Sequence, residues 1–81
     1  MNEKQINLLK DNGYEVLSEF GFIVNQTKSI PIAYIFYDKK TNQFGLNVVD
    51  YTVIGNDYLV QYSDMLAEKI ILVRQLNDLR D

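Results

Sequence analysis

Residues 30–54, IPIAYIFYDKKTNQFGLNVVDYTVI, form the stretch that decides the fold. Valine, isoleucine, tyrosine and phenylalanine, which fit a pleated and half-buried surface, are dense on both sides of its middle. That middle, DKKTNQ at 38–43, opens with an aspartate that can accept hydrogen bonds from backbone amides. An asparagine near its end tolerates the left-handed backbone that closes many four-residue loops. The stretch therefore predicts a β-hairpin with residues 39–42 as its loop.

The loop also predicts the register, because it places Asp38 opposite Gln43 and every later pair follows from that one. On one face the expected pairs are Tyr37 with Phe44, Ile35 with Leu46 and Ala33 with Val48. On the other face they are Phe36 with Gly45, Tyr34 with Asn47, Ile32 with Val49 and Ile30 with Tyr51. The first face is the more uniformly apolar, so we expect it to face the core.

The second face mixes aromatic side chains with an asparagine and a glycine, which is typical of neither a core nor a solvated surface. One interpretation is a partly covered back of the sheet, with Phe36 shielding the backbone at Gly45. The other is a surface for a partner or a second copy, because tyrosine supplies a large amphipathic contact area. The residues expected to contact a partner there are Tyr34, Phe36, Asn47 and Tyr51.

The N-terminal part of the chain predicts a short helix over residues 3–11, capped by Asn2 and ended by Asn12-Gly13. For residues 14–24 the alternation favours a strand, with Gly21 at a bulge or bend. A continuation of the first helix through residues 14–19 is the alternative. Later in the chain, residues 55–57 are expected to form a turn and residues 58–61 a short strand or an extended lead-in to the last helix.

A long helix is predicted over residues 64–79, with Ser63 as its N-cap. Its broad apolar side comprises Met65, Leu66, Ile70, Leu72, Val73, Leu76 and Leu79. Ile71 is exceptional because it falls in the polar arc, with Ala67 one turn before it. It is either a singly exposed isoleucine or, with Ala67, a contact to a partner helix, such as the same helix of a second copy in a two-fold dimer.

These elements predict one α+β domain over residues 1–81. A short N-terminal helix is followed by an antiparallel sheet of three or four strands, and a long C-terminal helix packs on one face of the sheet. The expected core comprises Leu9, Val16, Phe20, Ile35, Leu46, Val48, Leu66, Val73 and Leu76.

Composition limits the function classes. Eleven acidic and eight basic residues, scattered along the chain, give a net charge of −3, so a phosphate-backbone binder with its basic patch is not expected. No run approaches the roughly 20 apolar residues that span a bilayer, and the first residues, MNEKQINLLKDNG, lack the features of a signal peptide. The expected location is cytoplasmic, away from any membrane.

Catalytic and metal-binding chemistry finds little support in the sequence. The chain has no histidine and no cysteine, and therefore lacks the usual general base, soft metal ligands and thiol nucleophile. Its four glycines are isolated and form no phosphate-binding loop. We expect no catalytic residues, no metal site, no cofactor and no enzymatic activity.

The leading functional hypothesis is a small acidic protein-binding module that inhibits or regulates a larger partner. Many small regulatory and phage-borne proteins, including inhibitors of bacterial defence enzymes, share this size and order of elements; the analogy goes no further than architecture. One alternative is a self-associating structural or accessory subunit. The other is a weak binder of nucleic acid or a small ligand through the aromatic sheet face.

Overall fold

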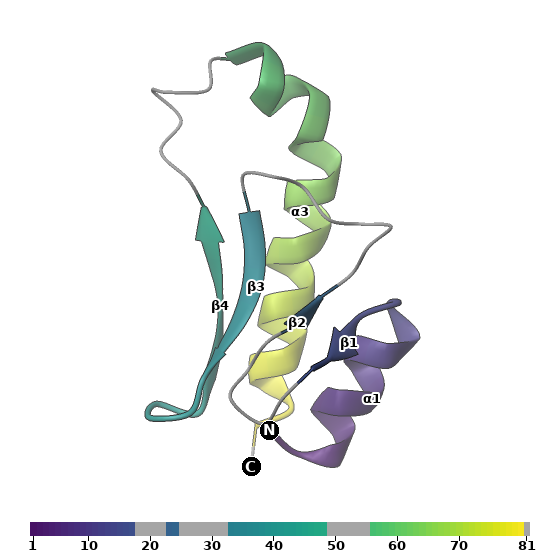
Figure 1. Ribbon diagram of the computed structural model, residues 1–81, viewed down its shortest axis with the longest axis vertical. Helices are drawn as coiled ribbons and strands as arrows, with labels where there is room; N and C mark the ends of the chain where they lie inside the picture. The colour runs from purple at the N-terminus through teal and green to yellow at the C-terminus, as the bar shows by residue number, and fades with distance from the viewer. Residues whose placement is uncertain (18–22, 25–32, 49–55, 81) are drawn as a thin grey trace.

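The computed structural model describes residues 1–17, 23–24, 33–48 and 56–80 of the chain. Its elements, in chain order, are α1 (Glu3–Asp11), β1 (Glu15–Val16), β2 (Ile23–Val24), β3 (Ala33–Asp38), β4 (Gln43–Val48) and α3 (Asn56–Asp78), as Figure 1 shows. The predicted α+β class, with a short first helix and a long last one, is confirmed. In the described residues the strands form two separate antiparallel pairs, β1 with β2 and β3 with β4, in place of the single sheet of three or four strands that was expected.

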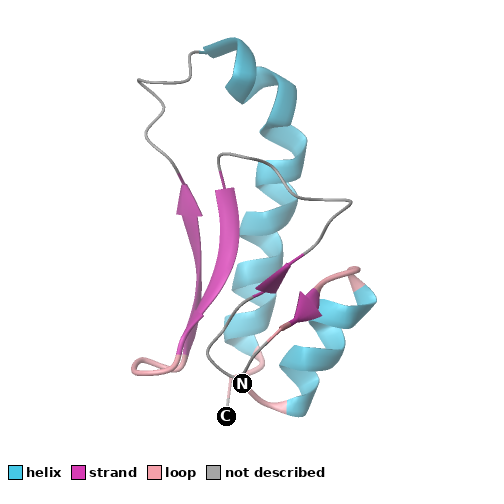
Figure 2. Ribbon diagram, viewed as in Figure 1, coloured by secondary structure: helices cyan, strands magenta, loops and turns pink. Residues whose placement is uncertain are grey.

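The long helix α3 is the centre of the arrangement. The β3–β4 hairpin lies along one side of it, and α1 with β1 and β2 lies beside its C-terminal half (Figure 2). The two ends of the chain come together at that same end of α3 (Figure 1).

The central hairpin has the predicted register at every described position, from Ala33 opposite Val48 to Asp38 opposite Gln43. The loop chemistry is also as expected. The Asp38 carboxylate accepts a hydrogen bond from the Lys40 N–H at 3.0 Å, and Asn42 has a φ of 55°. The predicted pairs of Ile32 with Val49 and Ile30 with Tyr51 lie outside the described residues.

The inner face of this hairpin packs on α3, as its apolar character predicted. The rings of Tyr37 and Phe44 are tilted against each other on this face, and their centroids lie 5.0 Å apart. The main cluster of buried apolar residues comprises Leu9, Tyr14, Ile23, Ile35, Tyr37, Phe44, Leu72 and Leu76.

The predicted core is largely confirmed. Leu9, Ile35 and Leu76 are buried. The partly buried predicted residues are Val16, Leu46 and Val73 beside the main cluster, and Val48 and Leu66 in a second cluster around Ala33. Phe20 lies outside the described residues.

The first helix has the predicted bounds and caps. The Asn2 side chain accepts from the Gln5 N–H at 2.9 Å, while the Gln5 side chain accepts from the Asn2 N–H at 2.9 Å, which makes a reciprocal capping box. After the C-cap at Asn12, Gly13 has a φ of 83°, in the left-handed region that glycine adopts without a steric penalty. The chain therefore leaves the helix at Gly13, and the alternative of a continuing helix is wrong for residues 14–17; residues 18–19 lie outside the described residues.

The prediction of one strand over residues 14–24 needs correction as well. Glu15 pairs with Val24 and Val16 with Ile23, so the segment reverses direction and its two ends run antiparallel. The alternation within the first end is as expected, because Tyr14 is buried while Glu15 and Leu17 are exposed. Gly21 lies outside the described residues.

The last helix begins earlier than predicted. It starts at Asn56, so the expected turn at Asn56 and Asp57 and the expected strand over residues 58–61 are both wrong, and Ser63 lies in the third turn of a helix. Instead of capping the start, the Ser63 hydroxyl donates to the Val60 carbonyl at 3.1 Å.

Substitution of Ser63 distinguishes the two helix starts. We expect Ser63→Ala to leave the free energy of unfolding unchanged or to raise it by up to about 0.5 kcal/mol, because alanine is the better helix former inside a helix. The measurement is urea denaturation, with Asn2→Ala as the control at a true N-cap, where a loss of about 1 kcal/mol is expected. A similar loss at Ser63 would contradict the start at Asn56.

Side-chain amides join the first helix to the last. Gln5, which is 1% exposed, donates from Nε2 to the Leu76 carbonyl at 2.9 Å, and Asn2 donates from Nδ2 to the Leu79 carbonyl at 2.8 Å. The final carbonyls of a helix lack partners within the helix. The start of α1 thus supplies donors to the end of α3.

A third amide attaches the hairpin to the same end of α3. Asn77 accepts from the Phe44 N–H at 2.8 Å and donates to the Phe44 carbonyl at 3.0 Å. Its side chain therefore pairs with the backbone of β4 as a neighbouring strand would, and it fixes the hairpin on the helix at one position.

Candidate functional site

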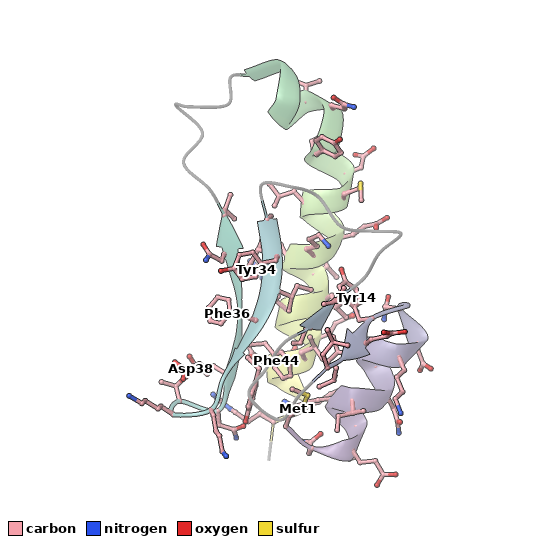
Figure 3. The ribbon with its side chains drawn as sticks, viewed as in Figure 1. Met1, Tyr14, Tyr34, Phe36, Asp38 and Phe44 are labelled. Carbon is pink, nitrogen blue, oxygen red and sulfur yellow. The ribbon has the colours of Figure 1, made fainter. Side chains whose placement is uncertain are left out.

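The face of the hairpin turned away from α3 carries the residues predicted to bind a partner. We call Tyr34, Phe36, Gly45 and Asn47 the outer hairpin face. Tyr34 is 55% exposed, Phe36 is 38% exposed and Asn47 is also exposed. Figure 3 shows the Tyr34 and Phe36 side chains over the β3–β4 hairpin. Tyr51, the fourth residue predicted for this surface, lies outside the described residues.

Two contacts hold the aromatic side chains of this face in place. The Asn47 Nδ2 donates to the Tyr34 hydroxyl across the strand pair at 2.5 Å. The Phe36 ring covers Gly45 so closely that a Cβ on residue 45 would lie 2.5 Å from Phe36 Cζ. The predicted shielding of Gly45 is therefore confirmed, and a glycine there leaves room for the end of the Phe36 ring. Both rings remain accessible, and each has a contact within the hairpin that favours one position.

The second predicted surface lies on α3. Ile71 is 56% exposed and Ala67 is exposed one turn before it, as their position in the polar arc predicted. Because the helix starts at Asn56, Val60 joins the same side and is 74% exposed. We call Val60, Ala67 and Ile71 the α3 stripe. Ile70 was expected on the buried side but is 42% exposed, at the edge of the apolar arc.

The structure keeps these two surfaces apart. The inner face of the hairpin contacts α3, so the outer hairpin face points away from the helix. The α3 stripe lies on the side of α3 opposite its buried residues Leu72 and Leu76. One partner surface cannot be formed from both sets of residues.

Sequence reasoning missed a buried polar pair between Lys69 and Tyr14. Lys69 is 3% exposed and its Nζ donates to the Tyr14 hydroxyl at 2.9 Å, with the same nitrogen 5.1 Å from the centre of the Tyr14 ring. Burial raises the pKa of Tyr14 above 10.0, and the negative charge of Glu68 raises it further. Tyr14 therefore stays protonated at neutral pH and is a poor candidate for a catalytic base.

A signal for the burial of Lys69 was present in the sequence. Lys69 is three residues from Leu66 and Leu72 and four from Val73, which places it in the centre of the apolar arc of the helix.

A pocket of about 320 Å³ opens beside this pair. It lies between the end of α1 and the helix α3, and one wall is formed by Ile71 of the α3 stripe. The lining residues are Asn12, Tyr14, Glu68, Ile71, Leu72 and Gln75. Its lining combines apolar surface with amides, one hydroxyl and one carboxylate, a mixture that selects no particular ligand class.

Metal ligands do not gather in the part of the chain that the structure describes, where no group of three or more acidic, histidine or cysteine residues is placed to hold an ion. None of the helices in the described residues is long and apolar enough to cross a membrane.

Comparison with known proteins gives no match to a protein-family model, to a curated protein or to a solved structure.

Proposed function

We propose that this protein is a small, acidic, non-catalytic protein-binding module that regulates or inhibits a larger partner through the outer hairpin face. The observation that carries the proposal is the pair of exposed aromatic side chains, Tyr34 and Phe36, on a strand whose other face is buried. Tyrosine and phenylalanine are enriched at the centres of protein interfaces, where they bury large areas.

The fixed positions of these rings favour binding. An interface loses affinity when mobile side chains must be ordered on association. Here Asn47 holds the Tyr34 hydroxyl and Gly45 accommodates the Phe36 ring before any partner arrives. The surface is therefore preorganised, and more of its contact energy is available for affinity.

Charge favours a protein over a nucleic acid as the partner. Between residues 33 and 48 the cationic side chains are Lys39 and Lys40, both exposed in the loop at the tip of the hairpin. A phosphate backbone requires a longer basic track than one loop supplies. Aromatic side chains on a surface with few cations suit the mixed apolar and polar surface of a folded protein.

Capture of a partner by immobilised protein tests this function. We expect Tyr34→Ala and Phe36→Ala each to reduce recovery of one specific protein from a lysate of the source cells by about tenfold or more, as loss of a central aromatic residue does. The matched control is Leu17→Ala, because Leu17 is 61% exposed on a different element. Equal recovery by all four proteins would contradict the assignment to the outer hairpin face.

Gly45→Ala gives a second, independent variant of the same surface. The added Cβ displaces the Phe36 ring while every partner-facing side chain is retained. We expect weaker capture with a change of less than about 1 kcal/mol in the free energy of unfolding, since alanine favours a strand more than glycine does. Undiminished capture would show that the position of the ring is irrelevant to binding.

A further inference from the structure

The α3 stripe has a pattern that none of the foregoing contacts uses. Val60, Ala67 and Ile71 are seven and four residues apart on a helix of 23 residues. At 100° per residue they fall within an arc of about 40°, directly opposite the buried side of the helix. All three are exposed, and Val60 and Ile71 are 74% and 56% exposed.

Two charged residues of opposite sign flank the centre of the stripe. Asp64 lies three residues before Ala67, and Arg74 lies three residues after Ile71, both exposed on the same side of the helix. In the described part of the chain neither has an ion-pair partner. Position 69 is the midpoint between Ala67 and Ile71, and it is also the midpoint between Asp64 and Arg74.

We infer that the α3 stripe binds the α3 stripe of a second copy of this chain, antiparallel, about a two-fold axis that passes beside position 69. In an antiparallel pair, residues equally far from the axis lie opposite each other. Ala67 then faces Ile71 of the second copy, and Asp64 faces Arg74 of the second copy. Two-fold symmetry produces each contact twice.

The pattern selects a second copy in this orientation. A single axis satisfies both the pair of Ala67 with Ile71 and the pair of Asp64 with Arg74, so the centre of the surface is complementary to itself. Val60, nine residues before the axis, then faces the exposed Asp78 of the second copy at the edge of the contact. A parallel arrangement would place Asp64 against Asp64 and Arg74 against Arg74 and is disfavoured by like-charge repulsion. The small Ala67 side chain opposite Ile71 lets the two helices approach closely at the centre.

The dimer leaves the proposed function intact and independent. The outer hairpin face points away from α3, so both copies would present Tyr34 and Phe36 to solvent. Monomeric variants would therefore separate the two proposals: they would still capture a partner if the outer hairpin face binds it.

The test is light scattering coupled to size exclusion on the full chain, over a hundredfold range of concentration. We expect the mass to rise from 9.5 kDa toward twice that value as concentration increases. Ile71→Glu should raise the dissociation constant at least tenfold, while Leu17→Glu, an equal change at an exposed site off the helix, should leave it unchanged. A parent protein that stays monomeric throughout, or an Ile71→Glu variant that dimerises normally, would overturn the inference.

Charge exchange tests the register itself. Asp64→Arg alone and Arg74→Asp alone should each be monomeric, because each places like charges opposite each other. An equimolar mixture of the two variants should form a heterodimer, since every facing pair is again of opposite sign. The double variant should dimerise like the parent. If these exchanges leave the dissociation constant of the dimer unchanged, the dimer forms through another surface. That result would refute the axis beside position 69. Circular dichroism is the control that each variant is folded. We expect folded variants because both positions are exposed.

Discussion

Replacing Gln5 with alanine is expected to lower the free energy of unfolding by about 3 kcal/mol. The side chain accepts from the Asn2 N–H and donates to the Leu76 carbonyl, and it is 1% exposed. Its removal leaves a cavity, takes a buried donor from the Leu76 carbonyl and takes the acceptor from the partly buried Asn2 N–H. The measurement is urea denaturation followed by circular dichroism.

The matched control is Gln75→Ala, the same chemical change at an exposed position of α3. Exposed substitutions usually change stability by less than about 0.5 kcal/mol. Equal effects of the two substitutions would show that the capping box and the link between the helices contribute nothing measurable.

The second large effect is expected for Tyr14→Phe, with a loss of about 2 kcal/mol in the free energy of unfolding at neutral pH. The Tyr14 hydroxyl accepts a hydrogen bond from Lys69 Nζ in a buried site, and removing one partner of a buried hydrogen bond costs about 1–3 kcal/mol. The control is Tyr34→Phe, which removes a hydroxyl from a tyrosine that is 55% exposed, where a change below about 0.5 kcal/mol is expected.

The difference in the free energy of unfolding between the parent protein and Tyr14→Phe is also expected to change at alkaline pH. The folded state raises the pKa of Tyr14 above 10.0, so the unfolded chain loses this proton first as pH increases. The stabilisation is complete below pH 10.0 and is lost as pH rises through the folded pKa. Denaturation at a series of pH values should therefore show the parent's advantage over Tyr14→Phe shrinking above pH 10.0. An advantage that widens there would contradict the direction of the shift.

The hairpin was predictable to the residue because its information is local. Asp38 and Asn42 specify a four-residue loop, and the alternation on both sides of the loop leaves one register that buries an apolar face. The first helix was predictable for the same reason, since Asn2 and Gly13 are strong signals at its two ends.

The start of α3 was missed because two local signals compete. Gly55-Asn56-Asp57 has the composition of a turn, and Ser63 followed by Asp64 has the composition of a helix start. The structure continues the helix through both residues of the second signal, and the Ser63 hydroxyl finds a carbonyl one turn back. Capping residues are tolerated inside a helix when their side chains bond in this way.

The sequence predicts which residues share each candidate surface. It does not predict the hydrogen bonds that position their side chains. Alternation places Tyr34 and Phe36 together, and helical spacing places Ala67 beside Ile71. Periodicity does not reveal that Asn47 holds the Tyr34 hydroxyl. Periodicity also does not predict the hydrogen bond between Lys69 and Tyr14, which joins residues 55 positions apart in the chain.

The hydrogen bonds from Asn2 and Gln5 to the end of α3 connect residues 77 and 71 positions apart. During synthesis the acceptors for these donors emerge from the ribosome long after the donors. The hairpin can close earlier because its paired residues are at most 15 positions apart. Contacts between distant parts of a chain form slowly because loop closure must precede them. The side-chain amides of Asn2 and Gln5 therefore cannot make these bonds until residue 79 has left the ribosome, so we expect the contact between the two helices to form after the hairpin.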